Sequence, residues 1–277
     1  MDESTPKQDS SLLHKLEKSA AQDAIPPLWL SYVKLTRVHK FPAGSILVFW
    51  PSAWGLALSA YSVGLPARIL AIQLIAHLVG SVLRHNAACI WNDMCDCEVD
   101  KLVNRTKGRP IARGLVSMTG ASILLSIHYV LCVLLLSYAG NFAMKVGLVG
   151  LFFIDVMYPL TKRWTNWPQA WLGVAMTWGL PVAWISVNGV MDWPLISTLF
   201  LGGICWTIHY DTIYACQDLR DDIKAGVRST AVLFGSALTT LDFDVGSECW
   251  AMFKANGDLG FVILGGMLGD YALRVLL

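Results

Sequence analysis

Long apolar stretches separated by short polar segments make up most of the chain, and six of them have a length suited to membrane-spanning helices. A helix that crosses a bilayer needs about 20 mostly apolar residues. The candidate spans are residues 41–64, 69–91, 115–144, 146–160, 164–191 and 193–217. The second and the last begin apolar and become polar toward their C-terminal ends. This pattern predicts an all-α, multi-pass transmembrane bundle of about seven to nine helices.

The composition indicates that lipid is the solvent for most of this chain. Hydrophobic residues make up 55% of the 277 positions and charged residues 15%, with a mean hydropathy of +0.52. These values are too apolar for an ordinary soluble domain. Asp155 interrupts one candidate span, and a carboxylate at that depth is costly unless it faces the bundle interior or water.

Lysine and arginine residues gather in alternate connections between the spans. The net charge of +1 gives no indication of a nucleic-acid partner. Basic residues are concentrated before the first span and after the second, fourth and sixth, so these segments are predicted to face the cytosol. Residues 1–40 are predicted to form a largely disordered cytosolic tail, and residues 41–277 the membrane-embedded domain. The tail resembles neither a signal peptide nor a transit peptide, which favours the endoplasmic reticulum, or a bacterial plasma membrane.

Four acidic residues follow the second span, beside an asparagine. If the helix continues through them, Asn92, Asp96 and Asp100 lie at i, i+4 and i+8, with Asp93 close to the same face. Clustered carboxylates repel one another unless a cation lies between them. Hard oxygen ligands of this kind suit Mg2+, which bridges to substrate phosphates and is therefore the predicted cofactor.

A second acidic cluster follows the sixth span on the same predicted side of the membrane. Asp211, Tyr214, Asp218 and Asp222 fall at i, i+3, i+7 and i+11, close to one stripe of a helix. Two such stripes can face each other across the cavity of a helix bundle. The alternative is a pair of solvated loops whose acids pair with nearby lysines, but the matched side and spacing favour a shared site.

Basic residues follow each acidic cluster, and topology alone predicts some of them. They are Arg105, Lys107, Arg109 and Arg113 after the first cluster, and Arg220, Lys224 and Arg228 after the second. Mg2+ together with Arg or Lys neutralises a diphosphate leaving group in enzymes. Loss of diphosphate from an allylic substrate leaves a carbocation, which needs an apolar cavity lined by aromatic faces. The sequence has 12 Trp, 8 Tyr and 10 Phe residues but does not show which of them line a cavity.

With these motifs the chain resembles the UbiA superfamily of intramembrane aromatic prenyltransferases, whose two signatures read NDxxDxxxD and DxxxD. The first is matched by Asn92, Asp93, Asp96 and Asp100, and the second by Asp218 and Asp222. Segments 105–114, 158–163 and 167–169 also match, and the resemblance extends over roughly residues 35–235. It implies a helical membrane fold in which both motifs cap a central cavity and Mg2+ holds a prenyl diphosphate.

The resemblance also implies a role for each matching residue. The metal ligands would be Asn92, Asp93, Asp96, Asp100, Asp218 and Asp222. Four of these carboxylates, Asp96, Asp100, Asp218 and Asp222, are the predicted catalytic residues. The diphosphate would be bound by Arg105, Lys107, Arg109, Lys162 and Lys224. The residues predicted to bind the acceptor are Arg37, His85, Asp211 and Tyr214.

The chain departs from the family pattern in two places. Family members that prenylate 4-hydroxybenzoate place an arginine where this chain has His85, and imidazole does not form the bidentate pair that an arginine makes with a carboxylate. His85 is equally well interpreted as a packing residue. The C-terminal region offers only two weak helix candidates, 229–241 and 259–277, so the bundle is predicted to lack part of one wall.

The leading hypothesis is Mg2+-dependent transfer of a farnesyl or geranylgeranyl group to an aromatic or pyrone acceptor. The residues of these motifs most resemble those of fungal family members that build meroterpenoids. Two alternatives use the same ionising machinery: cyclisation of the prenyl diphosphate without an acceptor, and 4-hydroxybenzoate polyprenyl transfer in ubiquinone synthesis. A transporter is the non-enzyme alternative, because intramembrane acids also mark transport paths.

Overall fold

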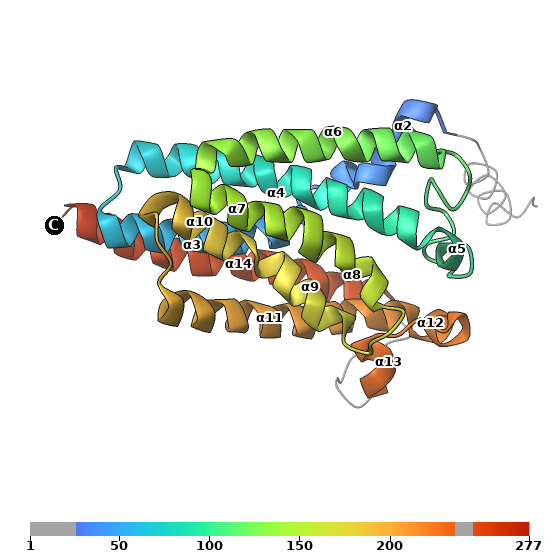
Figure 1. Ribbon diagram of the computed structural model, residues 1–277. Helices are drawn as coiled ribbons and strands as arrows, with labels where there is room; N and C mark the ends of the chain where they lie inside the picture. The colour runs from blue at the N-terminus through green and yellow to red at the C-terminus, as the bar shows by residue number, and fades with distance from the viewer. Residues whose placement is uncertain (1–25, 236–245, 277) are drawn as a thin grey trace, which may run out of the picture.

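The computed structural model describes residues 26–235 and 246–276, and all regular structure in these ranges is helical. The long helices run side by side in one bundle (Figure 1). An all-α bundle was predicted, and this is confirmed. The described helical segments outnumber the seven to nine expected, because breaks divide several spans into shorter pieces.

Five helical stretches are long and apolar enough to cross a membrane. They are α3 (Ser45–Val63), α4 (Ala67–Cys95), α6 (Met118–Leu136) with the turn η2 (Ser137–Ala139), α7 (Asn141–Val149) joined through η3 (Gly150–Ile154) to α8 (Asp155–Thr161), and α9 (Pro168–Thr177) followed by α10 (Gly179–Asn188). The sixth predicted span forms helix α11 (Trp193–Ala215), which is not among these five. Its lower hydropathy comes from the polar residues toward its C-terminal end, which include Asp211.

Helix α3 is the most enclosed of the five, and small residues allow its neighbours to approach it closely. A side-chain carbon at Gly55 would lie 2.8 Å from the carbonyl oxygen of Leu180 on α10. A side-chain carbon at Gly173 on α9 would lie 2.9 Å from the Cα of Ile204 on α11. Small residues at such contacts are typical of helix packing in membranes, where backbone approach replaces the hydrophobic driving force.

The intramembrane carboxylate is buried against a positive charge. A π-helical turn, η3, immediately precedes Asp155, whose side chain is 8% exposed. Its two oxygens accept hydrogen bonds from Arg84 Nε and Nη2 at 2.7 and 2.6 Å, and the same Nη2 donates to the carbonyl oxygen of Ala175 at 2.7 Å. The expectation that Asp155 faces the bundle interior is confirmed.

The C-terminal part of the fold corrects the expectation of a weak helix confined to residues 259–277. Helix α14 (Gly246–Leu276) runs along α3 and α11 for most of the length of the bundle (Figure 1). Trp50 Nε1 of α3 donates to the carbonyl oxygen of Gly257 at 2.9 Å, and Trp206 Nε1 of α11 donates to Asn256 Oδ1 at 2.8 Å. The polar residues near position 256 made this helix look interrupted, whereas Asn256 has a partner on α11. The 229–241 candidate includes α13 (Thr230–Phe234), and its part beyond residue 235 lies outside the described residues.

The segment before the first span is also more ordered than predicted. Residues 28–36 form α2 (Leu28–Thr36), followed by the turn η1 (Val38–Lys40). Leu35 is completely buried in a cluster with Ala87 and Ile90 of α4. The predicted disordered tail therefore does not extend to residue 40, because an apolar side chain holds this segment to the bundle. Residues 1–25 lie outside the described residues.

Candidate active site

Both acidic motifs lie where a long helix breaks, at the same end of the bundle (Figure 1). Helix α4 ends at Cys95, and Asp96 caps it before the short helix α5 (Cys97–Asp100). Helix α11 passes through the turn η4 (Cys216–Asp218) into α12 (Leu219–Ala225). The sequence analysis considered one continuous helix through the first motif, but the helix breaks at Asp96. Backbone bonds from Asp96 N to Asn92 O at 2.9 Å and from Asp100 N to Asp96 O at 2.8 Å nevertheless preserve the spacing.

The two motifs border one cavity of about 500 Å³, here called the motif cavity. Its acidic and amide lining comprises Asn92, Asp96, Asp100, Gln169, Asp211, Asp218 and Asp222. A hydrogen bond of 3.0 Å from Asn104 N to the Asp221 carboxylate joins the loops that follow the motifs. The expectation of two Asp-rich motifs over one cavity is confirmed.

Basic side chains of the protein neutralise most of these carboxylates. Lys162 Nζ donates to Asp96 Oδ2 at 2.7 Å and to Asn92 Oδ1 at 3.0 Å. Arg105 contacts both oxygens of Asp218, with distances of 2.5 to 2.8 Å. Among the described residues, no group of three or more His, Cys, Asp or Glu side chains is arranged to hold a metal ion directly.

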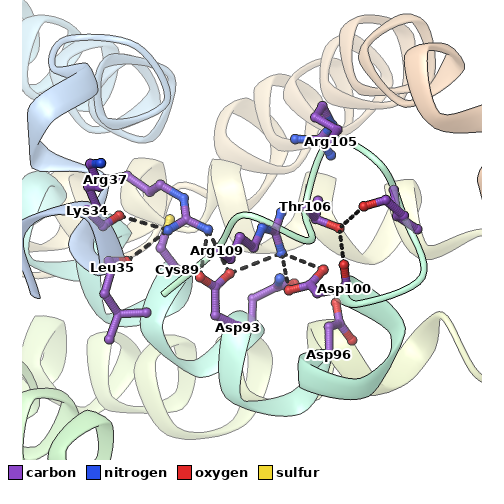
Figure 2. A network of polar contacts seen from close by, with 12 residues as sticks. Lys34, Leu35, Arg37, Cys89, Asp93, Asp96, Asp100, Arg105, Thr106 and Arg109 are labelled. Atoms are coloured by element: carbon purple, nitrogen blue, oxygen red, sulfur yellow. Dashed lines mark hydrogen bonds and ion pairs between the residues drawn. The ribbon is translucent and has the colours of Figure 1, made fainter. Parts of the chain in front are cut away.

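A second set of pairs begins next to the motif cavity (Figure 2). Arg109 Nη1 lies 2.8 Å from Asp100 Oδ2 and 3.1 Å from Asp93 Oδ1. Asp93, which is 1% exposed, also accepts two hydrogen bonds of 2.7 Å from Arg37 Nη2. Arg37 has a left-handed backbone, with φ of 63°, at the end of α2. Asp93 is therefore bound by two guanidinium groups.

Asp222 differs from the other motif carboxylates. Within residues 26–235 and 246–276 it makes no ion pair within 4.0 Å. Burial raises its pKa to about 6, and repulsion from Asp218 adds to the effect. Burial also raises the pKa of Asp100, although Arg109 opposes that change. A carboxylate that is destabilised by a like charge gains most when a cation binds beside it.

A larger cavity, here called the central cavity, adjoins the motif cavity and has a volume of about 690 Å³. The side chains that border both cavities are Asn92, Arg105, Arg109, Tyr158, Asp211 and Tyr214. Five aromatic residues line the central cavity: Tyr158, Tyr210, Tyr214, Trp250 and Phe253. The cavity that carries the acidic motifs thus leads into a larger cavity whose wall combines these aromatic residues with charged side chains.

Comparison with known proteins decides the family. The chain matches the UbiA prenyltransferase family over residues 48–273. The chain belongs to the UbiA prenyltransferase family. This prenyltransferase is 37% identical to the UbiA prenyltransferase claS of Ampulloclitocybe clavipes, in an alignment that covers 88% of this chain and 92% of that protein.

A plant protein and an archaeal structure are also similar to this chain. The chain is 37% identical to the mitochondrial 4-hydroxybenzoate polyprenyltransferase of Arabidopsis thaliana, over 86% of this chain and 55% of that protein. It therefore spans only about half the length of that relative. A UbiA homologue of Archaeoglobus fulgidus, solved with GPP and Mg2+, has the same fold, with a TM-score of 0.56 at 15% identity over 89% of this chain and 83% of that chain.

The donor set of this UbiA-family prenyltransferase fits Mg2+. The oxygens around the motif cavity are hard ligands from both motifs, the type that Mg2+ prefers. Lys162 places an ammonium group between Asn92 and Asp96, which shows that these two side chains together accommodate a cation. By donor chemistry, Asn92, Asp96, Asp100, Asp218 and Asp222 are therefore the residues that could hold the metal, although the described carboxylates are not gathered around one point as they stand. Asp93 lines the central cavity instead and is occupied by its two arginines.

The predicted diphosphate-binding residues of the prenyltransferase divide into two groups. Arg105, Arg109 and Lys162 border the motif cavity. Lys107 and Lys224 are exposed and border neither cavity, and Lys107 Nζ instead donates to Asn104 Oδ1 at 2.9 Å. The structure therefore does not bring Lys107 and Lys224 to the site, because the loop that carries Lys107 and the helix α12 that carries Lys224 expose these side chains to solvent.

The four predicted acceptor-binding residues, Arg37, His85, Asp211 and Tyr214, all border the central cavity. His85 Nδ1 lies 3.1 Å from Ser45 Oγ, and its Nε2 lies 3.6 Å from Cys89 Sγ. Gly44, with φ of +76°, leaves room for this ring, because a side-chain carbon there would lie 2.5 Å from His85 Nε2. His85 is thus fixed by hydrogen bonds at the cavity wall.

Sequence reasoning missed several cavity residues. Lys40, Arg84, Trp250 and Phe253 border the central cavity, and Arg228, named above only among the basic residues after the second cluster, borders the motif cavity. The i, i+3 spacing of Trp250 and Phe253 indicates a shared helical face, but only once α14 is known to begin before residue 250. Arg84 could have been found from Asp155, since an intramembrane carboxylate requires a buried partner.

Proposed function

We propose that this prenyltransferase uses Mg2+ to transfer a prenyl group from its diphosphate to a carbon atom of an aromatic or pyrone acceptor. Farnesyl and geranylgeranyl are the favoured chains, and meroterpenoid biosynthesis is the favoured context. The observation that carries the proposal is the junction of an acid-lined cavity with an aromatic-lined cavity through six shared side chains. The bilayer surrounds the bundle, and the site opens toward the cytosol from the endoplasmic reticulum membrane.

The motif cavity supplies the groups that ionisation of an allylic diphosphate requires. Mg2+, when bound, neutralises charge on the diphosphate and so assists its departure. Arg105, Arg109 and Lys162 border the same space and can donate charge-assisted hydrogen bonds to the leaving group. These side chains are held in place by motif carboxylates before substrate arrives, which favours a preorganised site.

The central cavity then suits the second half of the reaction. The C–O bond breaks with both electrons leaving on the diphosphate oxygen, and the allylic cation gains stabilisation from nearby ring faces. Tyr158 and Tyr214 border both cavities and therefore stand closest to the point where the cation forms. A ring carbon of the acceptor forms the new C–C bond, and loss of its proton restores the conjugated ring. Placement of the two substrates provides most of the rate.

The relatives support this reaction class. The fungal relative is named a UbiA prenyltransferase, and the Arabidopsis relative a 4-hydroxybenzoate polyprenyltransferase. His85, at the wall of the central cavity, stands where 4-hydroxybenzoate-specific members of the family carry arginine. An imidazole lacks the bidentate fork that arginine offers to a carboxylate, which favours a hydroxyl or a pyrone oxygen as the group that His85 orients.

The proposal is tested with purified protein in lipid nanodiscs. Geranyl, farnesyl and geranylgeranyl diphosphates are each supplied with Mg2+ and a panel of phenolic acids, hydroquinones and hydroxypyrones. We expect diphosphate release together with a C-prenylated product, whose mass gain gives the chain length. Terpene product in the absence of acceptor would favour cyclisation. Absence of any product from all donor and acceptor pairs would contradict the proposal.

A further inference from the structure

Six side chains border both the motif cavity and the central cavity, and only one of them is suited to accept a proton. The six are Asn92, Arg105, Arg109, Tyr158, Asp211 and Tyr214. Amide and guanidinium groups offer no basic lone pair near neutral pH, and a phenol there still carries its own proton. Among the described residues, Asp211 is therefore the one base at the junction of the two cavities.

Asp211 also lacks a cationic partner. In residues 26–235 and 246–276 it forms no ion pair within 4.0 Å. The other two carboxylates of the central cavity, Asp93 and Asp155, each pair with an arginine, at 2.7 and 2.6 Å. Asp222 makes no such pair either, but it borders the motif cavity alone. Within the described part of the chain, Asp211 is thus the one carboxylate of the central cavity that no basic side chain pairs with.

A neutral amide positions the Asp211 side chain. Gln169 Oε1 accepts a hydrogen bond of 3.0 Å from Thr230 N, and the same amide group hydrogen-bonds to Asp211. Because the amide oxygen is taken by Thr230, its NH2 group is the donor to the carboxylate. Such a bond orients a carboxylate without pairing it with a positive charge. Asp211 on α11 is therefore held in place and still able to bind a proton.

The new C–C bond forms at this same junction. The C–O bond breaks where the diphosphate in the motif cavity joins the prenyl chain in the central cavity, so the attacking ring carbon must approach that point. This carbon keeps its hydrogen when the C–C bond forms, and the ring then carries the positive charge. The C–H electron pair must return to the ring while a nearby base takes the proton. His85 is poorly placed for this, because Ser45 and Cys89 occupy its two ring nitrogens.

We propose that Asp211 is the general base of this prenyltransferase and accepts the proton from the ring carbon to which the prenyl group is joined. This inference rests on the proposed function and adds a proton acceptor to it. The sequence analysis predicts for Asp211 only contact with the acceptor. Before the proton moves, the carboxylate also stabilises the neighbouring positive charge.

The test measures whether loss of the ring proton limits the rate. Each donor and acceptor pair that gives product in the panel described above is used, in lipid nanodiscs with Mg2+, with hydrogen or deuterium on the ring carbons of the acceptor. Product, prenyl alcohol and diphosphate are quantified for wild type, Asp211→Asn and Asp211→Glu. A thermal melt of each variant verifies folding.

The matched control is Asp192→Asn. Asp192 caps the start of the same helix, accepts a hydrogen bond of 3.1 Å from Leu195 N, and borders neither cavity. Asparagine caps a helix about as well as aspartate, so this variant makes the same chemical change without touching the site. Its turnover should match that of wild type.

In wild type the proton is lost rapidly, so deuterium should leave the rate unchanged. In Asp211→Asn the prenylated product should fall by about 100-fold or more, the usual contribution of a general base. Deuterium should slow this variant further, because cleavage of the C–H bond now limits its rate. Diphosphate release should fall less than product, since the ionising groups are intact, and water should trap the cation as prenyl alcohol. Asp211→Glu should recover part of the rate, because it restores a carboxylate.

Three results would overturn the inference. Turnover in Asp211→Asn equal to that in Asp192→Asn would leave the departing diphosphate as the proton acceptor. A slower Asp211→Asn whose rate does not respond to deuterium would make Asp211 a structural residue. A raised KM for acceptor as the only change would make it a binding residue. Absence of product from every pair in wild type would instead contradict the proposed function, and the base assignment would fall with it.

Discussion

Asp218 is the residue at which structural and catalytic roles can be separated most clearly. Its side chain is 10% exposed and accepts three contacts from Arg105, of 2.8, 2.8 and 2.5 Å. The substitution Asp218→Asn keeps the size of the side chain and removes its charge. If Asp218 had only a structural role, the variant should lose stability and keep turnover.

The structural cost of Asp218→Asn is modest. Charge-assisted hydrogen bonds contribute about 1.5–3 kcal/mol, and an amide oxygen retains part of that. Arg105 is 35% exposed, so water replaces some of the lost contact. We expect a loss of about 1–2 kcal/mol, which corresponds to a fall in Tm of roughly 2–8 °C for a protein of this size. Turnover should fall much further, by at least about 100-fold, the usual effect of removing one charge-stabilising group from an active site.

The control for this variant is Asp221→Asn. Asp221 lies three residues along the same segment, borders neither cavity, and accepts a hydrogen bond from Asn104 N. Diphosphate release and Tm are measured for both variants under saturating donor and acceptor. Turnover within about threefold of wild type in Asp218→Asn, or equal losses in the two variants, would refute the assignment of Asp218 to the reaction.

Three other perturbations follow from the structure. Arg84→Met should lower Tm by about 6–12 °C, because it leaves the carboxyl group of Asp155 buried and unpaired. The double variant Arg84→Met/Asp155→Leu should recover most of this loss. A double variant that is less stable than Arg84→Met would contradict this reasoning. Gly44→Ala should raise the KM for acceptor more than the KM for donor, because the added side-chain carbon would displace His85. KM values equal to those of wild type would show that acceptor binding does not depend on the position of the His85 ring. Chelation of divalent ions with EDTA should abolish turnover, and Mg2+ should restore it; full activity in EDTA would contradict metal dependence.

The fold was predictable where helices are long and uniformly apolar. The spans that became α3 and α6 were identified from hydropathy alone. Helix α14 was identified only in part, as the weak candidate 259–277, because Lys254, Asn256 and Asp258 interrupt its apolar pattern. Only the tertiary contact between Asn256 and Trp206 explains how such a residue lies inside a bundle. Helix α2 was missed because its nine residues are too few for a membrane span, although Ser31, Leu35 and Thr36 are buried against the bundle.

The residues of the candidate site could be predicted from the sequence where they recur at regular helical spacing. The i+4 pattern of the first motif located Asn92, Asp96 and Asp100, and the structure places them on one cavity with the second motif. Spacing does not show which basic side chains turn inward. Lys162 and Lys107 both follow a span in a basic segment, yet only Lys162 borders a cavity. Side-chain direction in irregular loops depends on contacts between distant segments, which a single sequence does not reveal.

The pairing of Lys162 with Asn92 and Asp96 also bears on how a membrane protein tolerates a cluster of charges. A protein that carries its own counterions keeps its electrostatic energy low in surroundings where isolated charges are costly. Arrival of substrate then exchanges partners among charges already present. The affinity for substrate then depends on the difference in free energy between the ion pairs within the protein and the pairs that form with substrate. Weakening an ion pair within the protein can therefore raise the affinity for substrate while it lowers the stability of the protein.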